Sequence, residues 1–114
     1  MMTINKICLE FRGELDSKFN PPFTDLDTFK VTKDLQKRLA KEQIRTTFRV
    51  GQLIFDDKSY GQENVKHFWL EYRHGLKTIY IDLTAKKYQF FINEVIPKVI
   101  IGKLPRYFKM CENN

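Results

Sequence analysis

Residues 65–84 constrain the fold most, because they read as two β-strands joined by a tight turn. Both halves, 65–72 and 77–84, are rich in the aromatic and β-branched residues that favour strands. Between them lie His74 and Gly75, residue types that tolerate the positive φ of a two-residue hairpin turn. The sequence therefore predicts a β-hairpin with His74 and Gly75 at its tip.

This turn would place His67 directly opposite Asp82, and opposed residues share one face of a hairpin. One face would then be apolar, and the other would hold an imidazole beside a carboxylate. The apolar face would carry Phe68, Leu70, Ile79 and Ile81, and the other His67, Trp69, Tyr80 and Asp82. Such a carboxylate can orient an imidazole and stabilise its protonated form. The alternative is an incidental pair on an exposed polar face.

Composition indicates one folded domain over residues 1–114, since 42% of the residues are hydrophobic and 14% aromatic. No apolar run approaches the ~20 residues of a membrane span, so no membrane partner is expected. Early acidic residues argue against a secretory signal. We therefore expect a cytoplasmic protein, or a domain delivered into a target cell as part of a larger secreted protein.

Two cysteines, Cys8 and Cys111, lie too far apart to form a metal-ligand motif, and nothing in the sequence supports a disulfide between them. We expect no metal and no cofactor. The net charge of +6 fits an acidic partner or nucleic acid. However, the basic residues are spread along the chain without a block of five, which argues against nucleic acid. Those at Lys33, Lys37, Arg38 and Lys41 resemble the solvated side of a helix.

Two helices are predicted in the first part of the chain. Residues 4–19 carry one apolar stripe, formed by Ile4, Cys8 (or Ile7), Phe11, Leu15 and Phe19, and Asn20-Pro21-Pro22 would end the helix. If the regular helix begins near Cys8, the helix dipole would lower the pKa of this thiol. The alternative is that Cys8 is a small buried hydrophobe. Residues 31–41 form the second helix, with Val31, Leu35 and Leu39 buried and Thr28 or Thr32 as its cap.

Strands dominate the rest of the chain. Residues 44–55 predict a strand with a β-bulge at Gly51, where the apolar parity changes, and residues 56–64 a polar loop with a turn at Gly61. Residues 85–93 are ambiguous. Residues 95–101 predict a strand that starts irregularly at Pro97 or lies at an edge. We expect Tyr107 and Phe108 to close the core and residues 111–114 to fray. The fold class is α+β, with N-terminal helices packed on an antiparallel sheet.

The order of Cys8 in the first helix, His67 in a strand and Asp82 in the next strand resembles the transglutaminase-like and papain-like cysteine hydrolase superfamily. His67-Phe68-Trp69-Leu70-Glu71 is similar to its H-x-W-x-E strand, and Asp82-Leu83-Thr84 to its D-x-T motif. Compact bacterial toxin and effector domains are the nearest relatives that this likeness suggests. No Cys-Gly-x-Cys-Trp pattern surrounds Cys8, so an ordinary papain-type protease is not expected.

The resemblance implies a thiol enzyme that acts on amide bonds of a protein, as a protease, a glutamine deamidase or a transglutaminase. Cys8 would be the nucleophile, His67 its base, and Asp82 the residue that orients His67. The backbone N–H of Cys8 and the side chain of Asn5 would stabilise the oxyanion, and Trp69 would pack beside the site. The alternatives for the amide donor are Gln43, Gln52 and Gln62. The partners implied are a protein substrate and an immunity or regulatory protein.

The competing hypothesis is a catalytically inactive basic module that binds a protein or nucleic acid. The two hypotheses differ in where they place Cys8. A thiol enzyme needs the Cys8 sulfur near a ring nitrogen of His67, whereas a Cys8 buried behind the sheet would exclude the triad.

Overall fold

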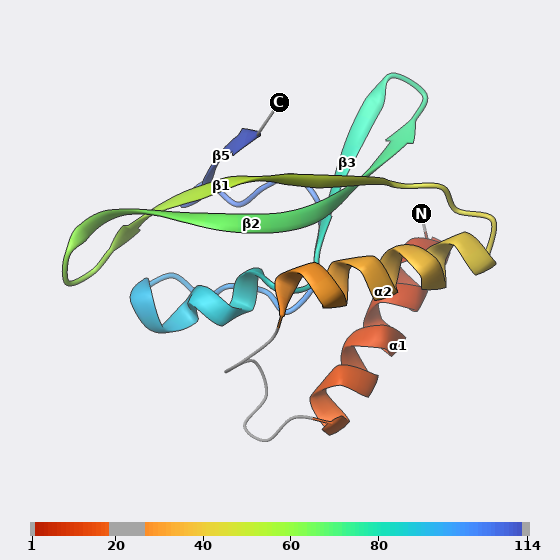
Figure 1. The fold of residues 1–114 in the computed structure, drawn as a ribbon, viewed down its shortest axis with the longest axis horizontal. Helices are drawn as coiled ribbons and strands as arrows, with labels where there is room; N and C mark the ends of the chain where they lie inside the picture. Colours follow the sequence, from red (N-terminus) through yellow and green to blue (C-terminus); the bar gives the residue numbers. More distant parts are fainter. Residues whose placement is uncertain (1, 19–26, 113–114) are drawn as a thin grey trace.

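The structure is a computed structural model that describes residues 2–18 and 27–112. Within these residues the elements are α1 (Met2–Lys18), α2 (Thr28–Lys41), β1 (Thr47–Asp57), β2 (Gly61–His74), β3 (Lys77–Asp82), the 3-10 helix η1 (Ala85–Phe91), β4 (Ile100–Gly102) and β5 (Lys109–Glu112). The strands form one antiparallel sheet in the order β4-β3-β2-β1-β5 (Figure 1). The predicted α+β class is confirmed.

Both N-terminal helices are present. The stripe on α1 is buried at Ile4, Cys8 and Leu15, as predicted, whereas Phe19 and residues 20–22 lie outside the described residues. Asp27 begins α2, because its side chain accepts a hydrogen bond from the Lys30 N–H at 3.1 Å. The prediction of Thr28 or Thr32 as the cap is therefore wrong. The buried stripe of α2 is confirmed at Val31, Leu35 and Leu39.

The hairpin of β2 and β3 has the predicted faces but a different register. His74 pairs with Lys77, so the tip is Gly75-Leu76 and not His74-Gly75. Gly75 takes the positive φ of 62° that such a turn needs. Leu70 consequently pairs with Ile81 instead of Ile79. The strands differ from the predicted register by two residues, and because side chains alternate with a period of two, each residue keeps its face.

No bulge occurs at Gly51, because β1 pairs with β2 without interruption from Thr47↔Glu71 to Asp57↔Gly61. Apolar residues occupy even positions before Gly51 and odd positions after it, because the two ends of β1 contribute to cores on opposite faces of the sheet. Phe48 packs against the helices, whereas Leu53 packs on the other side of the sheet. The predicted polar loop is shorter than expected, since both strands continue to a turn at residues 58–60. Gly61, where a turn was predicted, directly follows this turn as the first residue of β2 and has a φ of 89°.

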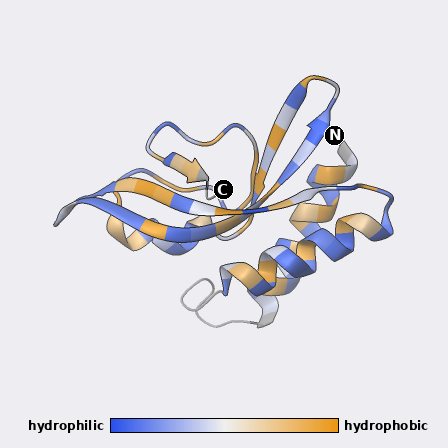
Figure 2. Ribbon diagram, turned by 45° about the horizontal axis from the view of Figure 1, so that its top comes forward, coloured by the Kyte–Doolittle hydropathy of each residue, from blue (hydrophilic) through white to orange (hydrophobic). Residues whose placement is uncertain are grey.

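Two apolar cores therefore lie on opposite faces of the sheet. Hydrophobic residues are interspersed with hydrophilic ones along its strands (Figure 2). The first, which we call the helix-side core, consists of Ile4, Ile7, Cys8, Leu35, Leu39, Leu70, Ile81 and Leu83. The second, the η1-side core, consists of Leu53, Phe55, Trp69, Tyr80, Ala85, Tyr88, Ile92, Ile96, Ile100 and Phe108. Leu70 and Trp69 are neighbours in β2, so their side chains belong to different cores.

The C-terminal part follows the predictions in outline. The ambiguous residues 85–93 contain η1, and the strand expected over 95–101 is reduced to β4 at the sheet edge, after Pro97. Phe108 is buried, and Tyr107 packs against the same core. The predicted fraying is wrong for Cys111, which pairs with Gln52 of β1; residues 113–114 lie outside the description. No helix in the described ranges has the length and apolarity needed to span a membrane.

Candidate functional site

His67 of β2 and Asp82 at the end of β3 come together in the fold. The Nε2 atom of His67 lies 2.6 Å from Oδ2 of Asp82. The two residues share a face of the sheet, and because of the register they meet diagonally instead of directly opposite each other. Both side chains are buried, with 0% and 3% of each residue exposed. The imidazole–carboxylate pair is therefore an interior feature of the protein.

Asp82 is surrounded by hydrogen-bond donors. Its Oδ2 also accepts a hydrogen bond from the Tyr80 hydroxyl at 2.5 Å, and its Oδ1 accepts bonds from the backbone N–H of Thr84 at 2.8 Å and of Ala85 at 3.0 Å. Burial alone would raise the pKa of Asp82, but His67 and the other donors hold that pKa below its usual value. The site therefore stabilises the carboxylate, which acts as an acceptor at the centre of the network.

The second nitrogen of His67 also has a partner. Nδ1 lies 3.2 Å from the hydroxyl of Tyr88, which comes from η1. The two rings meet edge to face with centroids 5.5 Å apart. Burial raises the pKa of Tyr88, so its hydroxyl stays protonated at neutral pH. With Asp82 on one nitrogen and Tyr88 on the other, the imidazole is fully engaged in structural contacts.

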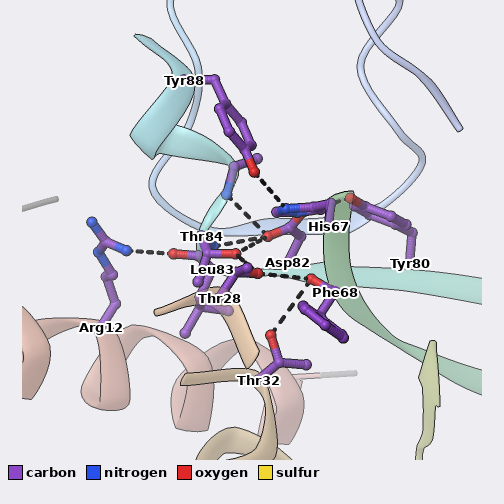
Figure 3. A network of polar contacts seen from close by, with 11 residues as sticks. Arg12, Thr28, Thr32, His67, Phe68, Tyr80, Asp82, Leu83, Thr84 and Tyr88 are labelled. Atoms are coloured by element: carbon purple, nitrogen blue, oxygen red, sulfur yellow. Dashed lines mark hydrogen bonds and ion pairs between the residues drawn. The ribbon is translucent and has the colours of Figure 1, made fainter. Parts of the chain in front are cut away.

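This network reaches both helices (Figure 3). The hydroxyls of Thr84 and Thr28 lie 2.8 Å apart, which ties the end of β3 to the start of α2. Arg12 of α1 donates a hydrogen bond to the carbonyl of Leu83. Burial lowers the pKa of Arg12 to about 10, with Asp16 opposing that shift, so the guanidinium remains charged at neutral pH. Residues 82–85, which follow the end of β3, are therefore linked to four elements: β2, α1, α2 and η1.

Cys8 lies elsewhere. It is fully buried in the helix-side core, in the same cluster as Leu70 and Ile81, whereas His67 points to the opposite face of β2. No hydrogen bond joins Cys8 to His67 in the part of the chain that the structure describes. The fold therefore brings together two of the three predicted triad residues and leaves the third on the other side of the sheet.

The environment of Cys8 also differs from the one expected of a nucleophile. α1 begins at Met2, so Cys8 lies beyond the first turn, where the dipole effect has faded. The prediction of a dipole-activated thiol is wrong, because burial raises the pKa of Cys8 to about 12. Cys8 is instead a small buried hydrophobe on the apolar stripe of α1, which was the alternative in the sequence analysis.

The predicted supporting residues lie apart. Asn5 is exposed on α1, and Gln43 and Gln62 are exposed as well. Trp69 is buried beside the network and stacks on Tyr80 with ring centroids 6.2 Å apart. Trp69 thus packs beside the His67–Asp82 pair. No amide side chain of this set is among the hydrogen-bond partners of His67 or Asp82 in the described residues.

Sequence reasoning missed several members of the network. Tyr80 was placed on the correct face, but no partner was predicted for it. Arg12 has a detectable signal, because it follows Cys8 by four residues on the buried side of a helix. Tyr88 carried no signal, since its segment has no clear period. Their contribution follows from the three-dimensional arrangement of η1 and α1 around residues 82–85.

Two cavities in the described residues lie away from these side chains. One of about 340 Å³ lies near the β1–β2 turn and is lined by residues 54–58, Gln62, residues 92–94, Arg106, Tyr107 and Lys109. Another of about 280 Å³ is lined by α1 residues and Glu42. Neither is lined by Cys8, His67 or Asp82. Within residues 2–18 and 27–112, His, Cys, Asp and Glu side chains form no cluster of three that could hold a metal.

Folding also gathers basic side chains that are dispersed in the sequence. α2 contains five basic residues and one acidic residue. Lys30, Lys33, Lys37 and Lys41 follow one another at steps of three and four, which places them in one row opposite the buried Leu39. Arg38 is engaged separately, by Glu14 at 2.9 Å. We refer to these four residues as the lysine row.

Comparison with models of protein families, with curated proteins and with solved structures gives no match. The likeness to cysteine hydrolases therefore consists of the short motifs at His67 and Asp82, together with the position of Cys8 in the first helix.

Proposed function

We propose that this chain is a non-catalytic binding domain for an anionic partner, in which the His67–Asp82 network has a structural role. One observation carries the proposal: both nitrogens of His67 are engaged by Asp82 and Tyr88, while Cys8 is buried in the other core. A catalytic base must reach the proton that it removes, and here no nitrogen is left for a thiol.

The chemistry of Cys8 supports the same conclusion. The thiolate is the reactive form of cysteine, and a pKa of about 12 leaves almost all of this thiol protonated at neutral pH. The side chain has no exposed surface, and neither cavity described above leads to it. In this conformation an acyl substrate could reach the sulfur only if the helix-side core opened.

The surface supports binding to an anionic partner. The chain carries a net charge of +6, and the lysine row concentrates part of that charge on the exposed side of α2. Clustered positive charge attracts anionic macromolecules and speeds their association. The lysine row can therefore present several ammonium groups to one anionic partner.

The thiol enzyme is the second candidate, and the observation in its favour is the 2.6 Å contact between His67 and Asp82. Such an enzyme would attack amide bonds of a protein through Cys8. α1 would have to move relative to the sheet, so that the sulfur and the imidazole share a cavity open to substrate.

A binding experiment separates the two candidates. Labelled poly-glutamate and a labelled single-stranded oligonucleotide are titrated with the wild type and with the Cys8→Ala variant. We expect both proteins to bind at least one polyanion with equal affinity, which falls as salt rises from about 50 to 200 mM. The proposal fails if neither polyanion binds, or if the protein hydrolyses amide bonds of a casein substrate in a manner that Cys8→Ala abolishes.

A further inference from the structure

Three phenylalanine rings meet at the surface of the helix-bearing face, where the start of α2 crosses the sheet. Phe29 of α2 lies 5.5 Å from Phe48 of β1 and 5.2 Å from Phe68 of β2, between ring centroids, in edge-to-face contacts. Phe48 and Phe68 complete the triangle at 5.5 Å. Phe29 is 47% exposed although it is a large apolar side chain. We call these three residues the aromatic triangle.

Two lysines flank the aromatic triangle. The Nζ atom of Lys33 lies 4.1 Å from the ring centroid of Phe48, and Nζ of Lys66 lies 5.6 Å from that of Phe68. Neither lysine forms an ion pair within residues 2–18 and 27–112. Cation–π contact leaves the charge of an ammonium group in place, so both remain available to an anion. The surface thus combines an apolar floor with a positively charged rim.

The aromatic triangle is continuous with the lysine row, because Lys33 is a member of the row and its Nζ atom lies over the Phe48 ring of the triangle. From Lys30 to Lys41 the row spans roughly 16 Å along the helix axis, at a rise of about 1.5 Å per residue. The carboxylates of this region are few. Asp27 caps the helix through the Lys30 N–H, Asp34 follows Lys30 by four residues on the side of the row, and Glu42 is the C-cap next to Lys41. A line of positive charge therefore leads away from the aromatic rings.

We propose that the aromatic triangle and the lysine row form a binding site for single-stranded nucleic acid. This inference rests on the proposed function as a binding domain and specifies its partner. Unpaired bases would stack on Phe29 and its neighbours, while phosphates would contact Lys33, Lys66 and the rest of the row. Stacking on aromatic side chains beside a basic track is the usual means by which proteins hold single strands without sequence preference.

A peptide partner fits this surface less well. Peptide and protein interfaces concentrate their binding energy where an anchor side chain fills a pocket. The cavities of about 340 and 280 Å³ are lined by other residues, and none of the aromatic triangle borders them. A partly exposed ring with two ammonium groups beside it offers a platform for a planar base and its phosphate instead.

The test is fluorescence anisotropy with a labelled single-stranded oligothymidylate, compared with the same sequence in duplex and with labelled poly-glutamate. We expect the wild type to prefer the single strand. Replacing Phe29 by Leu keeps an apolar side chain but removes the ring, and should weaken single-strand binding about tenfold. The double variant Lys33→Gln/Lys66→Gln should weaken it as well, and should reduce the slope of log affinity against log salt by about 1.4, for two lost phosphate contacts.

The matched control is Lys77→Gln/Lys103→Gln, which removes the same charge from exposed positions outside the site. It should leave the salt slope within a few tenths of the wild-type value, and the urea midpoint of each variant verifies folding. Equal weakening by the control and by Lys33→Gln/Lys66→Gln would overturn the assigned site. Binding of poly-glutamate but not of the single strand would overturn the nucleic-acid inference while supporting the proposed function. Binding of neither would overturn both.

Discussion

His67 and Phe68 are consecutive residues of β2, yet the two faces of the sheet treat them in opposite ways. On the η1 side, His67 is a polar side chain that is completely buried and has partners on both nitrogens. On the helix side, Phe68 is an apolar side chain that belongs to an aromatic triangle with a half-exposed member, beside lysines that form no ion pairs in the described residues.

The difference indicates which surface serves the structure and which serves a partner. A buried polar network with every group satisfied makes the arrangement of its elements unique, and it offers no vacant contact to a substrate. On the helix side, a half-exposed ring lies beside two lysines that form no ion pair in the described residues, so apolar surface and positive charge both stay accessible to a partner. His67 and Asp82, whose motifs resemble those of an enzyme, thus have the structural role.

Replacing Asp82 by Ala should produce the largest effect. The change leaves His67, Tyr80 and two backbone N–H groups without their common acceptor in a buried site, so we expect a loss of about 3–5 kcal/mol in the free energy of unfolding. Urea denaturation measures it. The matched variant Asp34→Ala on α2 should stay within about 0.5 kcal/mol. A loss below about 1 kcal/mol for Asp82→Ala would contradict the structural role.

Leu35 and Phe29 sharpen the comparison on a single helix. Leu35 is 1% exposed in the helix-side core, so Leu35→Ala should cost about 2–5 kcal/mol. Phe29 is 47% exposed, and Phe29→Ala should cost about 1 kcal/mol while weakening nucleic-acid binding strongly. Thermal or urea unfolding and anisotropy give the two readouts. If Phe29→Ala destabilised the protein as much as Leu35→Ala, Phe29 would be a core residue and not part of a binding surface.

The acid stability of the protein should depend on Asp82. Its pKa is lower in the folded than in the unfolded state, so its contribution to stability is complete above the unfolded pKa of about 3.9 and is lost as the pH falls through the lower folded pKa. The Asp82→Asn variant lacks this contribution at every pH. We therefore expect the stability difference between wild type and variant to be constant near neutrality and to shrink below about pH 4. A constant difference down to the lowest pH would show that the charge of Asp82 has no part in stability.

The smallest effect is expected for Tyr88→Phe. It removes the hydroxyl that contacts Nδ1 of His67 but keeps the ring in the η1-side core, so the free energy of unfolding should fall by about 1 kcal/mol. Binding to polyanions should not change, because the substitution lies on the other face of the sheet. A change in oligonucleotide affinity would indicate that the two faces are coupled.

Local patterns predicted much of the fold. The stripes at Ile4, Cys8 and Leu15 and at Val31, Leu35 and Leu39 located both helices, and the alternation in β2 and β3 assigned each side chain to the correct face. The register was not predictable with the same accuracy, because His74-Gly75 and Gly75-Leu76 both contain the glycine that the turn requires, and the choice between them leaves the faces unchanged.

The site was harder to predict than the fold, for two physical reasons. A pattern along the chain shows which residues of a strand share a face, but it does not show on which face of the sheet a distant helix packs. The separation of Cys8 from His67 could therefore not be predicted. The shift of apolar residues from even to odd positions near Gly51 was misread for the same reason. It results from two cores on opposite faces of the sheet, whereas a β-bulge was predicted from the sequence. The sequence placed Lys33, Lys37 and Lys41 on the solvated side of a helix, but their proximity to Phe48 could not be predicted, because it depends on how α2 crosses the sheet.

The central claim, that the buried histidine network is structural and Cys8 inert, is tested most directly by the rate of iodoacetamide alkylation of Cys8 against pH. The measurement uses the Cys111→Ser background, because Cys111 is an exposed free thiol, and compares it with the same protein carrying His67→Ala. We predict that Cys8 in the Cys111→Ser protein reacts far more slowly than a free thiol up to about pH 9, and reaches the free rate only in urea. Rapid alkylation at neutral pH that disappears with His67→Ala would contradict the account and establish an activated nucleophile.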